Sequence, residues 1–143
     1  MHKFDLQVAT PFVYSTNPLS AIGNIPVATE IPLDGTRVTL SGWGSPTPGT
    51  WLSHNLLESS IPLVYWMECS YNYKRVDRPV TDNMFCAGEY HNGVCGGDTG
   101  DPLTYNDTLI GIMSWDYGCN EQRFPAVFTA VYKYSDWINQ NIA

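Results

Sequence analysis

Positive charge is scarce in this sequence, which has 7 Lys and Arg residues against 14 Asp and Glu residues. The formal net charge of −7 argues against nucleic acid or an anionic membrane surface as the main partner, because both repel an acidic protein. Apolar runs are also short, and none approaches the roughly 18 residues that a membrane-spanning helix requires. The sequence therefore predicts neither a nucleic-acid partner nor a membrane partner.

Other common signals are missing as well. Residues 1–6 (MHKFDL) do not place an apolar segment after a charged one, so they do not read as a secretory signal peptide. Internal repeats and Gly/Ser-rich linkers are lacking, and no cofactor motif is found. Because no C-x-x-C spacing occurs, we expect no zinc or other metal site.

The sequence does contain four cysteines, together with five Trp and nine Tyr. An even number of cysteines in such a chain suggests two disulfides and an oxidising compartment. Asn106, Asp107 and Thr108 form an N-glycosylation acceptor sequence, which agrees with secretion. The cysteines and the glycosylation acceptor sequence are typical of an extracellular protein, whereas residues 1–6 lack the pattern of a signal peptide. We therefore expect the start of the protein to be missing from this sequence.

Short apolar runs separated by turn residues occur from residue 38 onward. The runs at 38–40, 59–64, 109–115 and 125–131 alternate with segments rich in Gly and Pro, which is typical of an all-β barrel or sandwich. Residues 17–35 contain repeated Pro and Gly and read as an extended connector. Near the end, apolar side chains recur every three or four residues, which predicts one amphipathic helix over 132–141.

One segment, 95–103 (CGGDTGDPL), resembles the nucleophile loop of trypsin and chymotrypsin relatives, which reads C-x-G-D-S-G-G-P-L. Further matches follow the order of that family, at 40–44 (LSGWG), 83–88 (NMFCAG), 110–115 (IGIMSW), 124–129 (FPAVFT) and 136–138 (DWI). The chain is therefore identified as a member of the chymotrypsin-like serine protease family. The resemblance implies protein or peptide substrates and no cofactor.

The resemblance also implies a fold. The family has two six-stranded antiparallel barrels with the active site between them, in a unit of roughly 200–250 residues. We expect residues 1–35 to be a remnant of the first barrel with the inter-barrel connector, and 36–143 to be the second barrel with its terminal helix. With the first barrel mostly missing, the face between the barrels would be exposed, available to a protein partner or to self-association.

Disulfide pairing follows from the resemblance. Cys69–Cys86 and Cys95–Cys119 match paired positions of the second barrel in the family. A third bridge of the family would join the positions that Val38 and Tyr105 hold here. Loss of both halves of that bridge leaves no unpaired thiol.

The resemblance places Thr99 at the nucleophile position, where relatives have Ser, and assigns the oxyanion hole to the N–H groups of Gly97 and Thr99. Thr carries an extra methyl group with a restricted χ1 angle, which would displace the hydroxyl in a pocket shaped for Ser. A misplacement of about 1 Å can cost about 100-fold in rate. Thr nucleophiles that do function rely on an N-terminal amine, whereas Thr99 is internal.

The remaining catalytic groups of the family have weak or no matches. Nothing in this sequence resembles the Ala-Ala-His-Cys stretch that carries the catalytic His, and we expect His54 and His91 to be solvated loop residues, with no role for His2. Asp5 is a weak match to the catalytic Asp. The resemblance therefore predicts that this chain does not hydrolyse peptides as it stands.

Two acidic residues flank the nucleophile position. In active relatives, the residue equivalent to Asp98 orders the loop by pairing with an amine released on activation. Without that amine, we expect Asp98 to turn outward or to become neutral, leaving the loop zymogen-like. Asp101 replaces a Gly of the family; it would repel an oxyanion, or it reflects drift at a site that no longer catalyses.

The substrate pocket of the family maps onto six residues. Gly93 and Val94 stand where a trypsin-like floor carries an Asp, so a preference for Lys or Arg is not supported. Asp116 replaces a Gly of the wall, where it would narrow the cleft or attract a cation. The positions that complete the pocket are Ser114, Trp115 and Ala126, the last of which replaces another Gly.

Four functional hypotheses remain open. The first is a secreted member of the serine endopeptidase family that is inactive in this chain. The second is an active endopeptidase of which this sequence is a truncated record. The third is a non-catalytic homologue that binds protein partners through the former cleft. The fourth is a truncated gene product with no independent function.

Overall fold

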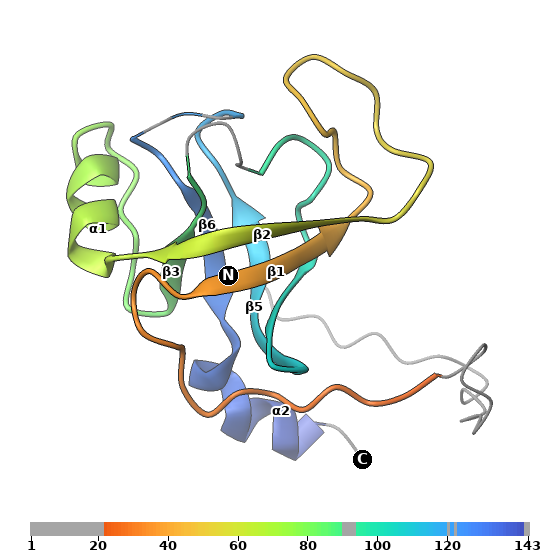
Figure 1. Cartoon of the computed structure of the whole chain (residues 1–143). Helices are drawn as coiled ribbons and strands as arrows, with labels where there is room; N and C mark the ends of the chain where they lie inside the picture. The colour runs from red at the N-terminus through yellow and green to blue at the C-terminus, as the bar shows by residue number, and fades with distance from the viewer. Residues whose placement is uncertain (1–21, 90–93, 120, 122, 142–143) are drawn as a thin grey trace.

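The computed structural model describes residues 22–89, 94–119, 121 and 123–141. Six antiparallel strands close into a barrel in the order β1-β2-β3-β6-β5-β4 (Figure 1). The strands are β1 (Arg37–Gly42), β2 (Leu57–Val64), β3 (Met84–Ala87), β4 (Pro102–Tyr105), β5 (Thr108–Trp115) and β6 (Ala126–Ala130). This architecture confirms the predicted barrel.

The barrel encloses an apolar core, and along β1 and β2 buried residues alternate with more exposed ones. In β1, Val38 and Leu40 are buried, while Thr39 between them is only partly buried. On the neighbouring strands β3 and β6, Phe85 and Phe128 are paired, and their rings stack with centroids 5.7 Å apart. Gly111 lies beneath these rings, where any Cβ would collide with Phe85.

The position of the third disulfide of the family is filled by apolar packing. The register Thr39–Thr104 between β1 and β4 places Val38 opposite Tyr105. Val38 is buried in the core, and Tyr105 packs against it. These two side chains therefore bring the strands together without a covalent link.

Helix α1 (Trp66–Lys74) was not predicted from the sequence. Tyr65, at the N-cap position before the helix, makes no side-chain capping hydrogen bond. The capping residue that usually marks the start of a helix in a sequence is therefore absent. Cys69 and Tyr73, four residues apart, form its buried face, and the Cys69–Cys86 disulfide attaches the helix to β3. The Tyr73 hydroxyl donates to the carbonyl oxygen of Pro125 at 2.8 Å.

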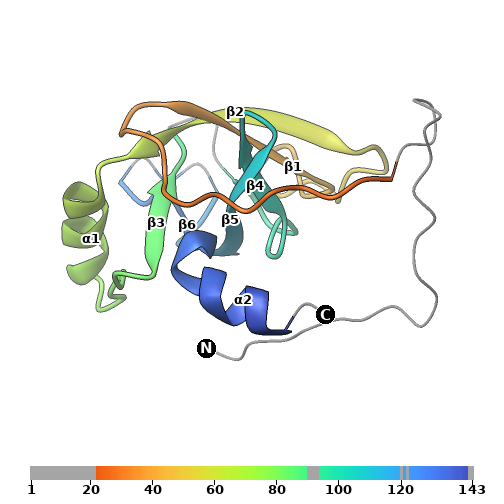
Figure 2. The same cartoon turned by 90° about the horizontal axis from the view of Figure 1, so that it is seen from below.

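The C-terminal helix was predicted at 132–141. The structure has a 3-10 helix, η1 (Val131–Tyr134), followed by α2 (Ser135–Asn141). The described part of the predicted connector, 22–35, has neither a helix nor a full strand. It runs across the barrel (Figure 2), and the N–H of Ala28 donates to the carbonyl of Leu109 in β5 at 2.9 Å.

Candidate functional site: a remodelled nucleophile loop

The loop before β4 carries the nucleophile position and is anchored to the barrel at both ends. Val94 and Cys95 are buried at its start, and the Cys95–Cys119 disulfide ties it to the segment after β5. At its end, the N–H of Gly100 donates to the carbonyl of Met113 at 2.9 Å, and the N–H of Met113 donates to that of Asp101 at 2.9 Å. Both predicted disulfides are therefore confirmed, and the loop is held against β5.

The segment that follows β1 holds the loop from its other side. The N–H of Ser45 donates to the carbonyl of Gly96 at 3.0 Å, and the N–H of Gly44 donates to Asp98 Oδ1 at 2.9 Å. Glycine is required at both ends of the turn around Trp43. A Cβ on Gly44 would collide with the Asp98 carboxylate, and a Cβ on Gly42 would collide with the carboxyl of Asp101.

Asp98 points into the protein. Its side chain is only 9% exposed, because it lies against the bare backbone of Gly44 and accepts the hydrogen bond of that residue. The expectation that Asp98 turns outward is therefore wrong. The physical reason is that the backbone N–H of Gly44 gives the Asp98 carboxyl group a hydrogen bond inside the protein.

Asp98 and Asp101 form a pair of acids at one site. Asp101 Oδ2 is buried, and no hydrogen-bond donor among the described residues reaches it. Burial is the largest cause that raises the pKa of Asp101, and the hydrogen bond to Asp98 and the charge of Asp98 raise it further, to about 6. A proton on Asp101 gives its carboxyl group a donor toward Asp98.

The predicted oxyanion-hole residues lie on the outside of this loop. Gly97 and Thr99 are both exposed, and Gly97 has a φ of 105°, in the left-handed region that favours glycine. The side chain of Leu52 packs directly over Gly97, where it would collide with any Cβ. An apolar side chain therefore covers part of the surface beside the nucleophile position.

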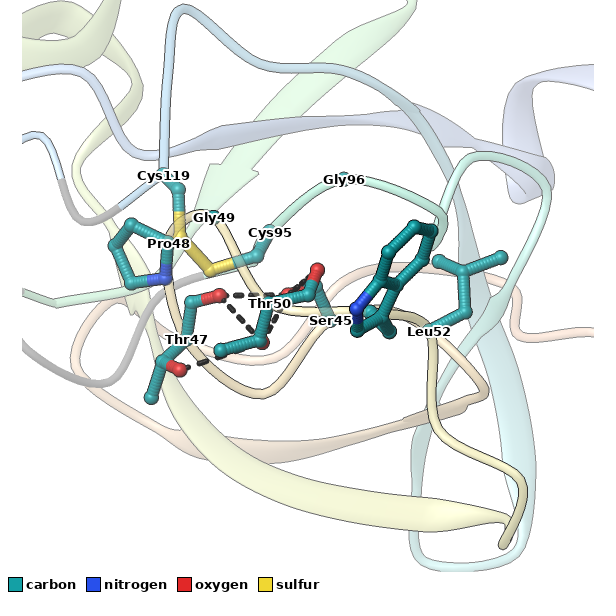
Figure 3. A pocket seen from close by; sticks show the side chains of 10 residues that line it. Ser45, Thr47, Pro48, Gly49, Thr50, Leu52, Cys95, Gly96 and Cys119 are labelled. Atoms are coloured by element: carbon teal, nitrogen blue, oxygen red, sulfur yellow. Dashed lines mark hydrogen bonds between the residues drawn. A yellow bond between two sulfur atoms is a disulfide. The ribbon is translucent and has the colours of Figure 1, made fainter.

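A pocket of about 340 Å³ opens next to the loop (Figure 3). One wall is the Cys95–Cys119 disulfide, and the other is the segment 45–52. Ser45, Thr47 and Thr50 stiffen this segment, since the Ser45 hydroxyl donates to the carbonyl of Thr47 at 2.6 Å and lies 2.7 Å from the Thr50 hydroxyl. Next to them, the side chain of Trp51 is 93% exposed.

The predicted substrate-pocket residues are in different environments. Val94 and Ala126 are buried in the barrel core. Ser114 and Trp115 are partly buried, and the ring of Trp115 packs edge-on against Tyr73 with centroids 4.8 Å apart. The charge of Asp116 affects the pKa of the same tyrosine. Burial is the main cause that raises the pKa of Tyr73, and the charge of Asp116 raises it further.

Several predicted residues fall outside the described part of the chain, namely His2, Asp5, His91 and Gly93. His54 is exposed, as expected for a loop residue. Within the described residues, no group of three or more His, Cys, Asp and Glu side chains could hold a metal ion. Among them, too, no helix is long and apolar enough to cross a membrane.

Comparison with known families identifies the family of this chain. Residues 7–138 match the family model described as Trypsin. The chain belongs to the trypsin family. It is 36% identical to Trypsin Blo t 3 of Blomia tropicalis over 137 residues, which are 93% of this chain and 51% of that protein.

Two further trypsins are similar to this chain at nearly the same sequence identity. Trypsin zeta of Drosophila erecta is 36% identical over 144 residues, covering 95% of this chain and 51% of the relative. Trypsin-1 of Salmo salar is 37% identical over 111 residues, covering 76% of this chain and 45% of the relative. The chain thus spans about half the length of the trypsins that it matches.

Two features of the site were not predicted. The Asp98–Asp101 pairing was missed, although both acids were singled out separately, and a spacing of three residues within a Gly-rich turn is the signal that could have suggested it. The position of Leu52 over Gly97 was missed entirely. It depends on how two loops meet, and no local pattern in 45–52 indicates it.

Proposed function

We propose that this chain is a secreted, non-catalytic member of the trypsin family that binds a protein partner through the surface around its nucleophile loop. The observation that carries the proposal is the acid pair. Asp101, two residues after Thr99, adds a second carboxyl group beside that of Asp98, at a position where the resemblance to the family implies a Gly. Above a pH of about 6, that carboxyl is ionised.

Negative charge at this point opposes the chemistry of the family. Hydrolysis by relatives develops a negative oxyanion that two backbone N–H groups must stabilise. Two carboxylates within the same loop disfavour that charge by like-charge repulsion. The added methyl group of Thr99 and the packing of Leu52 over Gly97 act in the same direction, because both restrict the approach of a peptide carbonyl.

The binding surface in this proposal is apolar. The loop between β1 and β2 projects from the barrel beside the nucleophile loop (Figure 1) and exposes large apolar side chains, namely Trp43, Trp51, Leu52 and Leu56. Apolar side chains gathered in this way mark sites of protein interaction. A protein or peptide is therefore the expected partner, and a second copy of the chain is the first to test.

Secretion and the domain boundary complete the proposal. The Cys69–Cys86 and Cys95–Cys119 disulfides are stable in an oxidising compartment, which supports secretion. We assign 36–143 to the barrel and its terminal helix, and 1–35 to the connector with a remnant of a first barrel. The start of β1 at Arg37 supports that boundary.

A second candidate is an active endopeptidase, with Thr99 as a working nucleophile in a longer product. Membership of the trypsin family favours it, and so does the exposure of Thr99 at the surface of the loop. The two candidates differ in whether peptide hydrolysis depends on the Thr99 hydroxyl.

Hydrolysis of a mixed peptide library separates them. The wild-type chain, and any longer natural product that contains it, is compared with its Thr99→Ala variant by mass spectrometry of the cleaved peptides. The proposal predicts equal, background cleavage for the two. Cleavage by the wild type that Thr99→Ala abolishes would support the active endopeptidase instead.

A further inference from the structure

The turn between β4 and β5 is a tight two-residue hairpin. Tyr105 pairs with Thr108, and between them Asn106 and Asp107 have φ values of 47° and 57°. A hairpin loop with positive φ at both central positions favours Asn, Asp and Gly, because these residues tolerate the left-handed region. The residues of this turn therefore match its conformation.

The Asn106 side chain is free at the tip of this hairpin. It is exposed, and within the described residues its amide group makes no hydrogen bond. The neighbouring contact involves only its backbone, since the Thr108 hydroxyl donates to the Asn106 carbonyl at 3.2 Å. A group attached to the side-chain nitrogen would displace no other contact of the fold.

We propose that Asn106 carries an N-linked glycan. It begins the one Asn-x-Ser/Thr sequence in the chain whose middle residue is not Pro. The proposal rests on the secretion that forms part of the proposed function, and it is independent of catalytic inactivity. Glycans are attached in the same oxidising compartment that forms disulfides.

The modification is a group transfer from a lipid-pyrophosphate-linked oligosaccharide, catalysed by the glycosylation machinery of the secretory pathway. The Asn106 side-chain nitrogen forms a bond to the anomeric carbon of the first sugar. The bond from that carbon to the pyrophosphate oxygen breaks, and the lipid pyrophosphate leaves with the electron pair. One amide proton is released, so no oxidant or reductant takes part.

The position of the hairpin allows the glycan and a bound partner to coexist. The β4–β5 turn lies at the opposite end of the barrel from the nucleophile loop (Figure 1). Beside it is a pocket of about 440 Å³, formed by the connector residues 26–32 together with Tyr105, Asn106, Thr108 and Ile110. The glycan would cover this pocket and leave the apolar surface around Trp51 open.

The test expresses the 143-residue chain with a cleavable secretory leader in a eukaryotic cell. All of the chain, inside the cells and in the medium, is analysed by intact mass and peptide mapping before and after peptide N-glycosidase treatment. The wild type is expected to carry one oligosaccharide, which the enzyme removes with conversion of Asn106 to Asp. Because transfer takes place inside the secretory pathway, chain that the cell retains gives the same information.

Matched variants make the result specific. Asn106→Asp keeps a residue that tolerates positive φ, and Thr108→Val keeps a β-branched residue in β5 but removes the hydroxyl; both are expected to abolish the modification. Thr108→Ser is expected to retain it. Disulfide-bonded wild-type chain with unmodified Asn106 throughout would overturn the inference, whereas a glycosylated chain that hydrolyses peptides would overturn only the proposed function.

Discussion

The carboxyl groups of Asp98 and Asp101 meet in one site over the bare Cα atoms of Gly42 and Gly44. Asp98 accepts a hydrogen bond from the Gly44 N–H at 2.9 Å, and Asp101 Oδ2 is buried without a hydrogen-bond partner among the described residues. Active trypsin relatives neutralise the equivalent of Asp98 with an ammonium group. In this chain, the carboxyl group of Asp101, from the same loop, lies next to Asp98.

The acid pair predicts that folding stability depends on pH. The pKa of Asp101 is about 6 in the folded chain and 3.8 as the reference value, so the folded state retains a proton that the unfolded state loses. The stabilisation is therefore present below about pH 4 and is lost as the pH rises through about 6. Asp101 is partly solvated, so we expect a loss on the order of 1 kcal/mol in the free energy of unfolding.

Asp101→Asn isolates this effect, because the amide donates a hydrogen bond to Asp98 at every pH. Urea unfolding from about pH 4 to about pH 7.5 should show a difference between variant and wild type that grows with pH in favour of the variant. A constant difference across this range would contradict the raised pKa of Asp101. Contributions of carboxyl groups that do not interact with Asp101 cancel in the comparison.

The fit of Gly44 against Asp98 predicts a large effect of one methyl group. Gly44→Ala places a Cβ on the Asp98 carboxylate, and we expect a loss of about 1–3 kcal/mol in the free energy of unfolding. Gly96→Ala, in the nucleophile loop that faces Gly44, is the matched control. A Cβ on Gly96 would meet nothing within 4 Å. That variant should stay within about 0.5 kcal/mol of the wild type by urea unfolding. Equal effects of the two substitutions would show that the loop does not pack as described.

The exposed apolar loop predicts self-association. Sedimentation velocity over a range of concentrations should show the wild-type chain forming dimers or larger species, and Trp51→Ser should shift it toward monomer. Leu33→Ser is a control of similar exposure, 85% against 93% for Trp51, in a different loop, and it should leave the association unchanged. A wild-type chain that remains monomeric at high concentration would exclude a second copy as the partner.

Much of the barrel could be predicted from local pattern. The apolar run at 109–115 corresponds to β5 (Thr108–Trp115), and the spacing near the C-terminus corresponds to η1 and α2. Helix α1 was missed because its buried face consists of Cys69 and Tyr73 alone, and both are positioned by distant partners, Cys86 and Pro125. Its own sequence contains no capping side chain and no broad apolar stripe.

The candidate site could be located from the sequence but not understood from it. The segment 95–103 identified the loop, and Asp101 was recognised as a departure from the family. Whether its carboxyl group faces solvent, the nucleophile or Asp98 depends on how 98–101 lies against 42–44, which is a tertiary contact. Its effect on the protonation of the loop follows only once that contact is known.

The central claim is that Thr99 is not a nucleophile. It is tested most directly by treating the native chain, and any longer natural product that contains it, with a fluorophosphonate reagent and mapping the adducts by mass spectrometry. The account predicts no adduct on Thr99 beyond that found on urea-unfolded chain. An adduct on Thr99 that forms only in the folded protein, and that disappears in Thr99→Ala, would contradict it.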